Sequence, residues 1–430
     1  MFRTGVNKFN IFRKTDLFKV SYWNGIATII KMAIGLVINK IVSIYLGSSG
    51  IALLGQFTNF TTLTNTIASM GINVGVTKYI AEHKGNEEQI KQLISTGFKL
   101  ILLATSLTSI SIFIGADYFC NKIIFNNEFV SIFYIFAATL FLFSINGFLL
   151  AILNGHKEFK KLIIINVCTS FVGLIIAVFL IINYGIFGAL LGVVLSNFLV
   201  IIISILFIFK SNWFKISNFF SAFHIPTFKK LSKYTLISFS SIFSGIFIQL
   251  LIRTYIINHL SIEEAGYWQG IVKISIIYLT IITTTLSIYY LPRLSEIKDD
   301  KELQQEIING YKFLLPLTIF SSLIIFVLRG PIIDILFAPS FQPMKKLLLF
   351  QLFGDIFKIG SWLLAYLLIA KAMVKINIIT EIIFGFLFYV FTMVFLKQYG
   401  IVGVTYAYCL NYILYFVVML FLFRKLLFLK

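Results

Sequence analysis

Long apolar runs fill almost the whole chain and are interrupted at length only once, by the polar stretch from Lys210 to Lys233. Only 12% of the 430 residues are charged and 59% are hydrophobic, which leaves too little polar surface for a water-soluble protein of this length. A transmembrane helix needs about 20 mainly apolar residues, and the runs of Ile, Leu and Phe supply many such segments. The short alternating strands of a membrane barrel are not seen. The sequence therefore predicts a helical protein that crosses a membrane many times.

The apolar runs predict about twelve transmembrane helices, divided equally by the polar stretch. The first six are expected near residues 22–46, 51–78, 93–115, 129–153, 161–183 and 186–209. The second six are expected near residues 234–258, 265–291, 308–328, 347–370, 374–396 and 402–423. The predicted fold class is an all-α polytopic membrane protein.

The excess of basic residues predicts the orientation of these helices. The formal net charge is +19, which in a soluble domain would suggest a nucleic-acid partner. Here most of the Lys and Arg outside the spans fall on the side of the N-terminus, and cytoplasmic loops collect such residues in polytopic proteins. We therefore expect both termini in the cytoplasm and no nucleic-acid partner.

Four regions follow from this topology. Residues 1–20 interleave basic and apolar side chains and are predicted to form a cytoplasmic interfacial segment. Residues 21–209 should form an N-terminal six-helix lobe and residues 234–430 a C-terminal six-helix lobe. Residues 210–233 should form a cytoplasmic interfacial linker, because aromatic residues such as Trp213 stand beside its lysines.

The two halves also contain a weak internal repeat. At an offset of 214 residues, LGSSGIALLGQ (residues 46–56) falls on LSIEEAGYWQG (residues 260–270). Both halves have an even number of predicted helices, so both enter the membrane from the cytoplasm and the repeat is parallel. The natural architecture is a pair of six-helix bundles that face each other across a central cavity.

The second predicted helix carries polar residues at intervals of three and four, so they share one helical face. These residues are Asn59, Thr62, Thr66, Ser69 and Asn73. Its repeat partner, residues 265–291, has Lys273 on the matching face. Polar faces at membrane depth turn toward protein or water. Two interpretations stay open: the stripe lines a cavity, or it supplies hydrogen bonds between helices.

Basic residues inside the spans give a further indication of function. Lys31, Lys273 and Lys358 lie near mid-membrane by their distance from the predicted helix ends, and an unpaired cation is costly there. Lys40 and Arg253 lie near the outer ends of their helices, where side chains can also reach the interface. Buried cations outnumber buried carboxylates, so we expect an anionic ligand, and a phosphate group suits Lys and Arg.

Two acidic residues, Asp355 and Glu381, also lie within predicted spans. Asp355 precedes Lys358 by three residues, a spacing that permits an ion pair. Either carboxylate could bind a coupling proton or cation, or could serve as a structural partner. The three cysteines form no CxxC pair and the four histidines lack metal-ligand spacing, so neither a metal site nor a cofactor is expected.

Several stretches resemble one transporter family. They are IYLGSSGIALLGQFTNF, MGINVGVTKYIAEHKGN, NGHKEFKKL, YYLPRLSEI and LLIAKAMVK. Together these stretches are similar to the O-antigen flippases, which are Wzx-type members of the polysaccharide transporter family. That family belongs to the multidrug/oligosaccharidyl-lipid/polysaccharide (MOP) exporter superfamily. The resemblance covers nearly the whole chain but offers no short signature, so the candidate site residues above rest on depth and periodicity.

The resemblance implies a non-enzymatic transporter with twelve helices in two lobes. It would move an undecaprenyl-pyrophosphate-linked oligosaccharide, such as the O-antigen repeat unit of lipopolysaccharide, across the bacterial cytoplasmic (inner) membrane to its outer leaflet. Expected partners are this substrate, membrane lipid, a polysaccharide polymerase and a chain-length regulator. The hypothesis for mechanism is alternating access, in which a cavity near Lys31, Lys273 and Lys358 opens first inward and then outward.

Other functions remain as alternatives. A flippase for a lipid-linked peptidoglycan or teichoic precursor would use similar chemistry, although resembling peptidoglycan-precursor flippases have fourteen helices. A MATE-like drug/cation antiporter would be expected to have an acidic cavity, and the basic excess speaks against it. A membrane glycosyltransferase or polymerase would need a catalytic loop outside the bilayer, and the sequence has neither a long outer loop nor a DxD motif.

Overall fold

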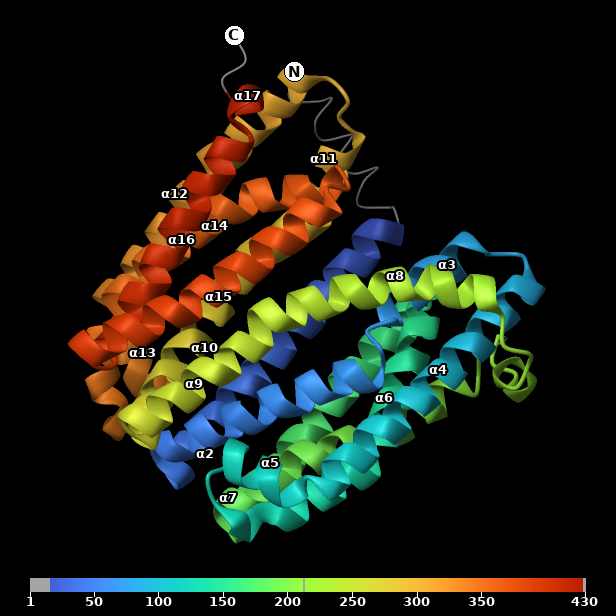
Figure 1. The fold of residues 1–430 in the computed structure, drawn as a ribbon, viewed down its shortest axis with the longest axis horizontal. Coiled ribbons are helices and arrows are strands. Elements are labelled where there is room, and N and C mark those ends of the chain that lie inside the picture. Colours follow the sequence, from blue (N-terminus) through green and yellow to red (C-terminus); the bar gives the residue numbers. More distant parts are fainter. Residues whose placement is uncertain (1–15, 212, 428–430) are drawn as a thin grey trace. The chain divides into compact units, whose positions relative to one another are not determined.

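The structure, a computed structural model, describes residues 16–211 and 213–427. The interfacial segment predicted for residues 1–20 lies mostly outside these ranges. Regular secondary structure in the described residues is helical (Figure 1). The helices before the polar stretch are α2 (Asp16–Ala68), α3 (Asn73–Glu82), α4 (Glu87–Ile114), α5 (Ala116–Ile123), the 3-10 helix η1 (Asn127–Phe129), α6 (Val130–Gly155) and α7 (Phe159–Ile208).

The remaining helices follow the first residues of the polar stretch. They are η2 (Ile216–Phe219), α8 (Ile225–Ile242), η3 (Phe243–Phe247), α9 (Ile248–His259), α10 (Ile262–Thr285), η4 (Leu286–Tyr290), α11 (Leu291–Glu296), α12 (Asp300–Val327), α13 (Arg329–Leu336), η5 (Pro339–Leu347), α14 (Leu348–Ala370), α15 (Val374–Tyr399), α16 (Val402–Leu422) and α17 (Arg424–Leu427). Of the short elements, η3 and η4 are π-helical and η2 and η5 are 3-10 helices.

In the described residues, ten helices are long and apolar enough to cross a membrane. Two of them, α2 and α7, each cover two predicted spans. Both contain one glycine with non-helical backbone, Gly47 (φ 66°) and Gly185 (φ 56°), at the point where the two spans meet. Glycine adopts positive φ without steric cost, so the chain can turn there. The ten helices confirm an all-α polytopic membrane protein; the number of spans and the placement of the termini stay predictions.

The helix predicted for residues 51–78 is broken, which the sequence pattern did not indicate. Helix α2 ends at Ala68, and Met70 and Gly71 have φ of 51° and 60° before α3 begins. The reason is a close approach to α8. A Cβ on Gly71 would lie 2.4 Å from the Cβ of Ser238, whose hydroxyl donates to the Gly71 carbonyl at 2.8 Å. The prediction of one continuous helix is wrong here.

The chain divides into two compact units. The first contains the described residues up to Ile41 together with Thr64–Ser238. The second contains Val42–Leu63 together with the chain from Phe239 onward. The predicted lobes, residues 21–209 and 234–430, did not assign a segment of the first half to the second unit. The membrane lobes themselves stay a prediction.

The first unit packs α3, α4 and α6 around an apolar core that includes Ile72, Ile94 and Phe148. The polar stretch joins this core through η2. Its Phe219 is buried, with its ring centroid 5.3 Å from that of Phe98.

Helix α4 also binds the backbone of the polar stretch. The Ser95 hydroxyl and the Lys99 ammonium both donate to the Ser221 carbonyl, at 2.6 and 2.7 Å. The His224 amide donates to the Thr96 hydroxyl at 3.1 Å. Much of the predicted linker is therefore packed on the first unit rather than connecting the units freely.

Glu158, in the turn between α6 and α7, fixes the start of the same stretch. Its carboxylate accepts hydrogen bonds from the Trp213 indole at 2.7 Å and the Ser211 hydroxyl at 3.0 Å, and forms an ion pair with Lys161 at 2.5 Å. Burial raises the pKa of Glu158, but the three donors outweigh burial and hold this pKa below its ordinary value.

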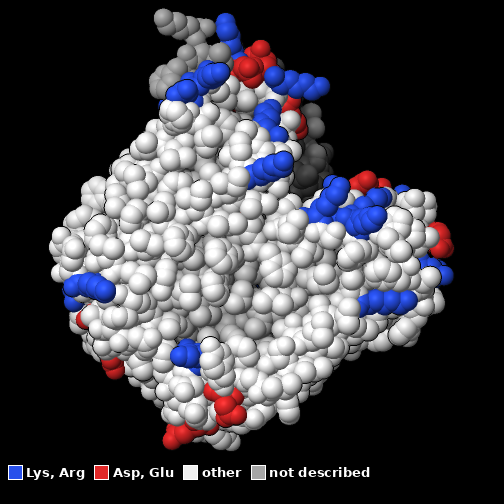
Figure 2. All heavy atoms as spheres, viewed as in Figure 1, with Lys and Arg blue, Asp and Glu red and all other residues white. Residues whose placement is uncertain are grey.

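Basic side chains gather where α3 packs against α8 in the first unit. The rings of Tyr79 and Tyr234 meet edge to face at 5.8 Å. The Lys78 ammonium lies 5.6 Å from the Tyr234 centroid, and the Lys230 ammonium lies 5.7 Å from that of Tyr79. Figure 2 shows a blue group over these helices, while the surface over the long helices is almost uncharged. This contrast is typical of a helical membrane protein.

The second unit is built around α14, which packs against α12 and α16. Its core includes Ile359 and Leu363 from α14, Leu314 from α12 and Met419 from α16. The polar groups described next lie beside this apolar core and come from α2, α8, α9, α10, α14, α15 and α16.

Candidate functional site

Arg253 on α9 is fully buried in the second unit. One terminal nitrogen, Nη1, donates to the Gln56 side-chain oxygen at 3.0 Å, and Nη2 donates to the Gln269 side-chain oxygen. The guanidinium carbon lies 5.5 Å from the ring centroid of Trp268. Among the described residues Arg253 forms no ion pair, and its Nε has no hydrogen-bond partner. Amide oxygens and an aromatic ring therefore stabilise this cation without a carboxylate.

Gln56 brings residues 42–63 into the second unit. Its amide nitrogen donates to the Thr254 hydroxyl at 2.7 Å, while its oxygen accepts from Arg253. Nearby, a Cβ on Gly266 would lie 2.1 Å from the Ser48 carbonyl oxygen, so only glycine permits this approach of α2 to α10. Figure 1 shows this part of α2, in blue, beside the yellow α9.

Two contacts here join residues that are 214 positions apart, the offset found in the sequence. The Ser49 hydroxyl donates to the Glu263 carboxylate at 3.0 Å. A Cβ on Gly55 would lie 2.8 Å from the side-chain carbon Cδ of Gln269. In a two-fold arrangement, a residue meets its own equivalent only near the symmetry axis. The contacts therefore support the predicted internal repeat.

Asp355 on α14 is also fully buried, and three hydroxyl groups donate to it. Ser275 and Tyr278 donate to Oδ2 at 2.7 and 2.8 Å, and Tyr408 donates to Oδ1 at 2.7 Å. Hydrogen bonds to a carboxylate are among the stronger ones in proteins. Asp355 therefore fixes α10 and α16 to α14.

Lys358 does not form the predicted ion pair with Asp355 in the described part of the chain. Its ammonium instead faces three aromatic rings, with centroids at 4.8 Å (Trp362), 5.5 Å (Tyr412) and 5.9 Å (Tyr408). The aromatic faces attract the cation. The hydroxyl of Tyr408 meanwhile reaches Asp355, so one tyrosine contacts both charged groups.

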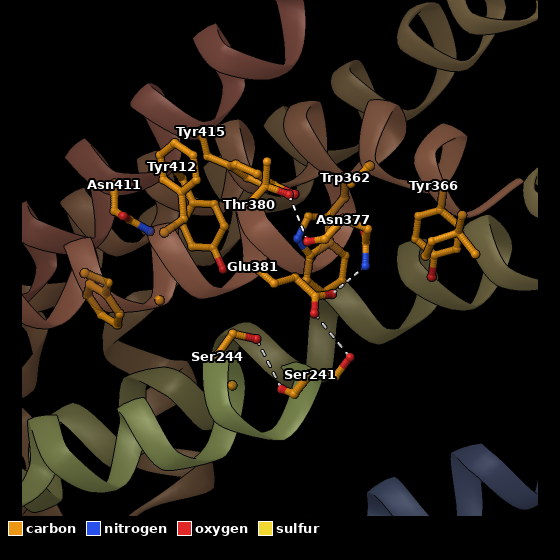
Figure 3. A pocket seen from close by; sticks show the side chains of 16 residues that line it. Ser241, Ser244, Trp362, Tyr366, Asn377, Thr380, Glu381, Asn411, Tyr412 and Tyr415 are labelled. Atoms are coloured by element: carbon orange, nitrogen blue, oxygen red, sulfur yellow. Dashed lines mark hydrogen bonds between the residues drawn. The ribbon is translucent and has the colours of Figure 1, made fainter. Parts of the chain in front are cut away.

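A pocket of about 420 Å³ lies beside this cluster, within the second unit. Side chains of α8, η3, α14, α15 and α16 surround it (Figure 3). The lining residues are Ser241, Ser244, Gly245, Trp362, Ala365, Tyr366, Ile369, Asn377, Thr380, Glu381, Phe384, Gly385, Phe388, Asn411, Tyr412 and Tyr415.

Glu381 is the one carboxylate in this lining. It accepts from the Asn377 amide at 3.2 Å, from the Ser241 hydroxyl at 3.3 Å and from the Ser240 hydroxyl at 3.5 Å. Figure 3 shows the carboxylate extending from α15 toward Ser241 on α8. Asn411, another lining residue, is 4% exposed, and its side-chain oxygen has no hydrogen-bond partner among the described residues. The pocket thus offers free acceptor capacity between aromatic walls.

The other predicted site residues are divided between the two units. Lys31 is an exposed residue of α2 in the first unit. The polar stripe is divided, because Asn59 and Thr62 belong to the second unit whereas Thr66 and Asn73 belong to the first. Asn73 also follows the break after α2, so it does not extend the helical face of the stripe.

Lys273 is partly buried on α10, one turn after Gln269 and on the same face. The structure therefore places Lys273 near the Arg253 cluster. Sequence reasoning missed Gln56, Trp362, Asn411 and Tyr412. Two patterns could have indicated polar faces on α15 and α16. One is the spacing of three and four residues among the tyrosines of α16, and the other is the i, i+4 pair Asn377 and Glu381 on α15.

The family model described as Polysaccharide biosynthesis protein matches residues 17–298, more than half of the chain. Two curated relatives, both called lipid III flippase, come from Escherichia coli (strain K12) and Shigella flexneri. Each is 28% identical over 402 residues, which cover 93% of this chain and 96% of the relative.

Solved structures share the fold at low sequence identity. An inward-facing multidrug resistance MATE family transporter of the MOP superfamily has a TM-score of 0.79 at 14% identity, covering 92% of this chain and 95% of that one. The lipid II flippase MurJ, in an inward closed conformation, has a TM-score of 0.75 at 18% identity, covering 93% and 87%. Together with the ten apolar helices, these relationships identify a multi-pass protein of the bacterial inner membrane. The chain belongs to the polysaccharide biosynthesis protein family and has the fold of the MOP superfamily.

Proposed function

We propose that this protein is a flippase that carries a lipid-linked oligosaccharide from the cytoplasmic to the outer leaflet of the bacterial cytoplasmic membrane. The observation that carries the proposal is the similarity to the lipid III flippase, which extends over 93% of this chain and 96% of that protein. A transporter fold supports it.

The proposed substrate is an O-antigen or related repeat unit on undecaprenyl pyrophosphate. Lys31, Lys273, Lys358 and Arg253 are proposed to attract its pyrophosphate. Both terminal nitrogens of Arg253 already bind glutamines, so Arg253 would act through its charge. Lys273, one turn beyond Gln269, is the proposed direct ligand of the phosphate oxygens.

Alternating access remains the proposed mechanism, and the membrane potential its proposed drive. Moving an anion out of an inside-negative cell gains about 2.3 kcal/mol per charge per 100 mV. Ion antiport through Asp355 or Glu381 is the competing drive. The three hydroxyl donors around Asp355 favour Glu381 for that role, because its carboxylate borders a pocket. If the flipping rate in proteoliposomes stays the same when the membrane potential is collapsed, ion antiport is favoured.

Complementation tests the function. The chain is expressed in Escherichia coli lacking its lipid III flippase, and in strains lacking other polysaccharide flippases, and the lipid-linked oligosaccharides are quantified. We expect at least one oligosaccharide to stop accumulating, and Lys273→Gln to reverse this while Lys425→Gln does not. Unchanged accumulation in every strain, with the protein present in the membrane, would contradict the proposal.

Two further functions have specific support. The fold of the lipid II flippase MurJ supports a flippase for a lipid-linked peptidoglycan or teichoic precursor. Rescue of a strain depleted of MurJ would favour this substrate. The fold of the MATE transporter and a carboxylate in an aromatic pocket support a drug/cation antiporter. Resistance to cationic drugs on expression, lost in Glu381→Gln, would favour antiport.

A further inference from the structure

The pocket beside Glu381 has a composition that pyrophosphate binding alone does not require. Six of its side chains are aromatic: Trp362, Tyr366, Phe384, Phe388, Tyr412 and Tyr415. Its other polar side chains are Glu381, two asparagines, two serines and one threonine. An aromatic wall with a few converging polar groups is the usual form of a small-molecule site.

The charges around the pocket disfavour both an anionic and a cationic ligand. Glu381 repels a phosphate, because its carboxylate faces the pocket (Figure 3). An organic cation would meet the opposite difficulty. The Lys358 ammonium already lies 4.8 Å from the centroid of Trp362 and 5.5 Å from that of Tyr412, and both residues line the pocket. A neutral ligand avoids both repulsions.

The free hydrogen-bond acceptors in the pocket restrict the class of ligand further. Glu381 retains acceptor capacity beyond its bonds to Asn377, Ser240 and Ser241. The Asn411 side-chain oxygen is buried without a partner among the described residues, which costs free energy unless a ligand donates to it. The ligand should therefore carry several hydroxyl or N–H donors around an apolar ring face that can stack on aromatic side chains.

We propose that this pocket binds a neutral pyranose sugar of the transported oligosaccharide. The inference rests on the proposed flippase function and adds the site that recognises the glycan. A sugar ring presents C–H groups on its faces and hydroxyl donors at its rim, which matches aromatic walls with a carboxylate and an amide oxygen. The volume of about 420 Å³ lies in the range of ligand pockets. Recognition of the sugar would then be separate from attraction of the pyrophosphate by Lys273.

The test fills the pocket without removing any contact. Gly245 lines the pocket, and a Cβ there would meet no atom within 4 Å. Gly245→Leu therefore places a side chain into the open space. Gly35→Leu is the matched control, because Gly35 is also helical and open but lies on α2 in the first unit. A second pair, Phe384→Leu in the pocket and the exposed Phe386→Leu as control, covers a folding defect of the first variant.

Binding is measured on the purified full chain by saturation-transfer difference NMR. The probes are the methyl glycosides of glucose, galactose, mannose and N-acetylglucosamine, with tetraethylammonium as a cationic probe. We expect a signal from at least one glycoside, at least fivefold weaker in Gly245→Leu and Phe384→Leu and unchanged in the two controls.

Two results would overturn the inference. One is the absence of a signal from all four glycosides, or a signal that the pocket variants do not change. The other is a signal from tetraethylammonium alone that Gly245→Leu removes, which would identify a cation pocket. Failure of the proposed function is distinguishable from failure of this inference. If the wild-type protein binds a glycoside but lowers no lipid-linked oligosaccharide in the complementation strains, the sugar pocket is supported and the flippase function is contradicted.

Discussion

Arg253 and Glu381 are both ionisable side chains of the second unit within membrane-spanning helices, and their surroundings differ in one respect. Arg253 is enclosed by Gln56, Gln269 and Trp268, with no exposed surface. Glu381 has three protein donors, Asn377, Ser240 and Ser241, and it also borders a pocket. A buried charge whose partners all come from the protein holds helices together, whereas one that keeps an open side is suited to a ligand. Mutation of Arg253 should therefore lower stability, whereas mutation of Glu381 should lower transport.

Removal of the enclosed arginine should have the largest effect. Arg253→Ala leaves the two glutamine oxygens without their donor and opens a cavity. We expect the free energy of unfolding to fall by about 3–5 kcal/mol, because each unsatisfied amide oxygen costs about 1–3 kcal/mol and the cavity adds to this loss. Thermal unfolding of the purified protein measures this, and Arg424→Ala, at an exposed site, is the control. Wild-type stability in Arg253→Ala would show that the cluster is not a structural lock.

Asp355 is a second buried ionisable residue whose partners come from the protein, so its replacement should also lower stability. Asp355→Asn keeps one acceptor oxygen but replaces the other by an NH2 group, which cannot accept from the hydroxyl groups. We expect a loss of about 1.5–3 kcal/mol in stability. Asp300→Asn in the exposed first turn of α12 should change little. Full stability combined with lost transport would instead return Asp355 to the ion-coupling role.

Glu381 should show the opposite behaviour. Glu381→Gln preserves the shape of the side chain and removes its charge, so we expect the melting temperature to stay within about 2 °C, because a loss under 1 kcal/mol moves it little. Transport measured by complementation should fall about tenfold, equivalent to about 1.4 kcal/mol. Glu296→Gln, exposed in α11, is the control. A variant that unfolds early but transports at the wild-type rate would reverse the assignment of the two regions.

The smallest effect is expected in the first unit, at Glu158. Its pKa is lowered in the folded protein, so its contribution to stability is present above the ordinary value of 4.5 and is lost as the pH falls through the folded pKa. Glu158→Gln should loosen the start of the polar stretch by about 1 kcal/mol, since the ion pair is partly exposed.

Limited trypsin cleavage at Lys210 and Lys215 measures this loosening. We expect cleavage to be about fivefold faster in Glu158→Gln at pH 7, and the difference from wild type to shrink in an exchange assay below pH 4. Glu87→Gln, whose contact with Lys215 is long and exposed, should behave as wild type. Equal cleavage rates in both variants would show that the cluster around Glu158 does not hold the stretch.

The sequence predicted the membrane spans well because apolar length is a local property. It also located the offset of 214 residues, which the contacts between Ser49 and Glu263 and between Gly55 and Gln269 reproduce. It did not predict the break at Gly71, because that turn is imposed by Ser238, a residue far along the chain. The spacing of the polar stripe continues to Asn73 in the sequence, but the break after α2 means that Asn73 does not share a helical face with the earlier residues.

The partners of the charged residues could not be predicted from the sequence, because most of them come from segments far along the chain. Lys358 and Asp355 have a spacing that permits an ion pair. Lys358 instead faces Trp362 on its own helix and two tyrosines of α16, and Asp355 accepts from hydroxyl groups of α10 and α16. The aromatic residues of the pocket look like ordinary core residues in an apolar helix. Gln56 lies near the start of the predicted span 51–78, and only the packing of α2 against α9 and α10 gives it a role.

The contact between Ser49 and Glu263 has a consequence for how such a chain can arise. In a dimer of identical subunits, a position on the axis must face a copy of itself, so a glutamate would oppose a glutamate and repel it. Within one chain the two positions are coded independently. One can become a hydroxyl donor and the other an acceptor, as here. The same freedom lets a glycine face a glutamine at Gly55 and Gln269, which leaves the room that Arg253 needs for its amide partner. A joined pair of halves can therefore build asymmetric chemistry at a place where symmetry would forbid it.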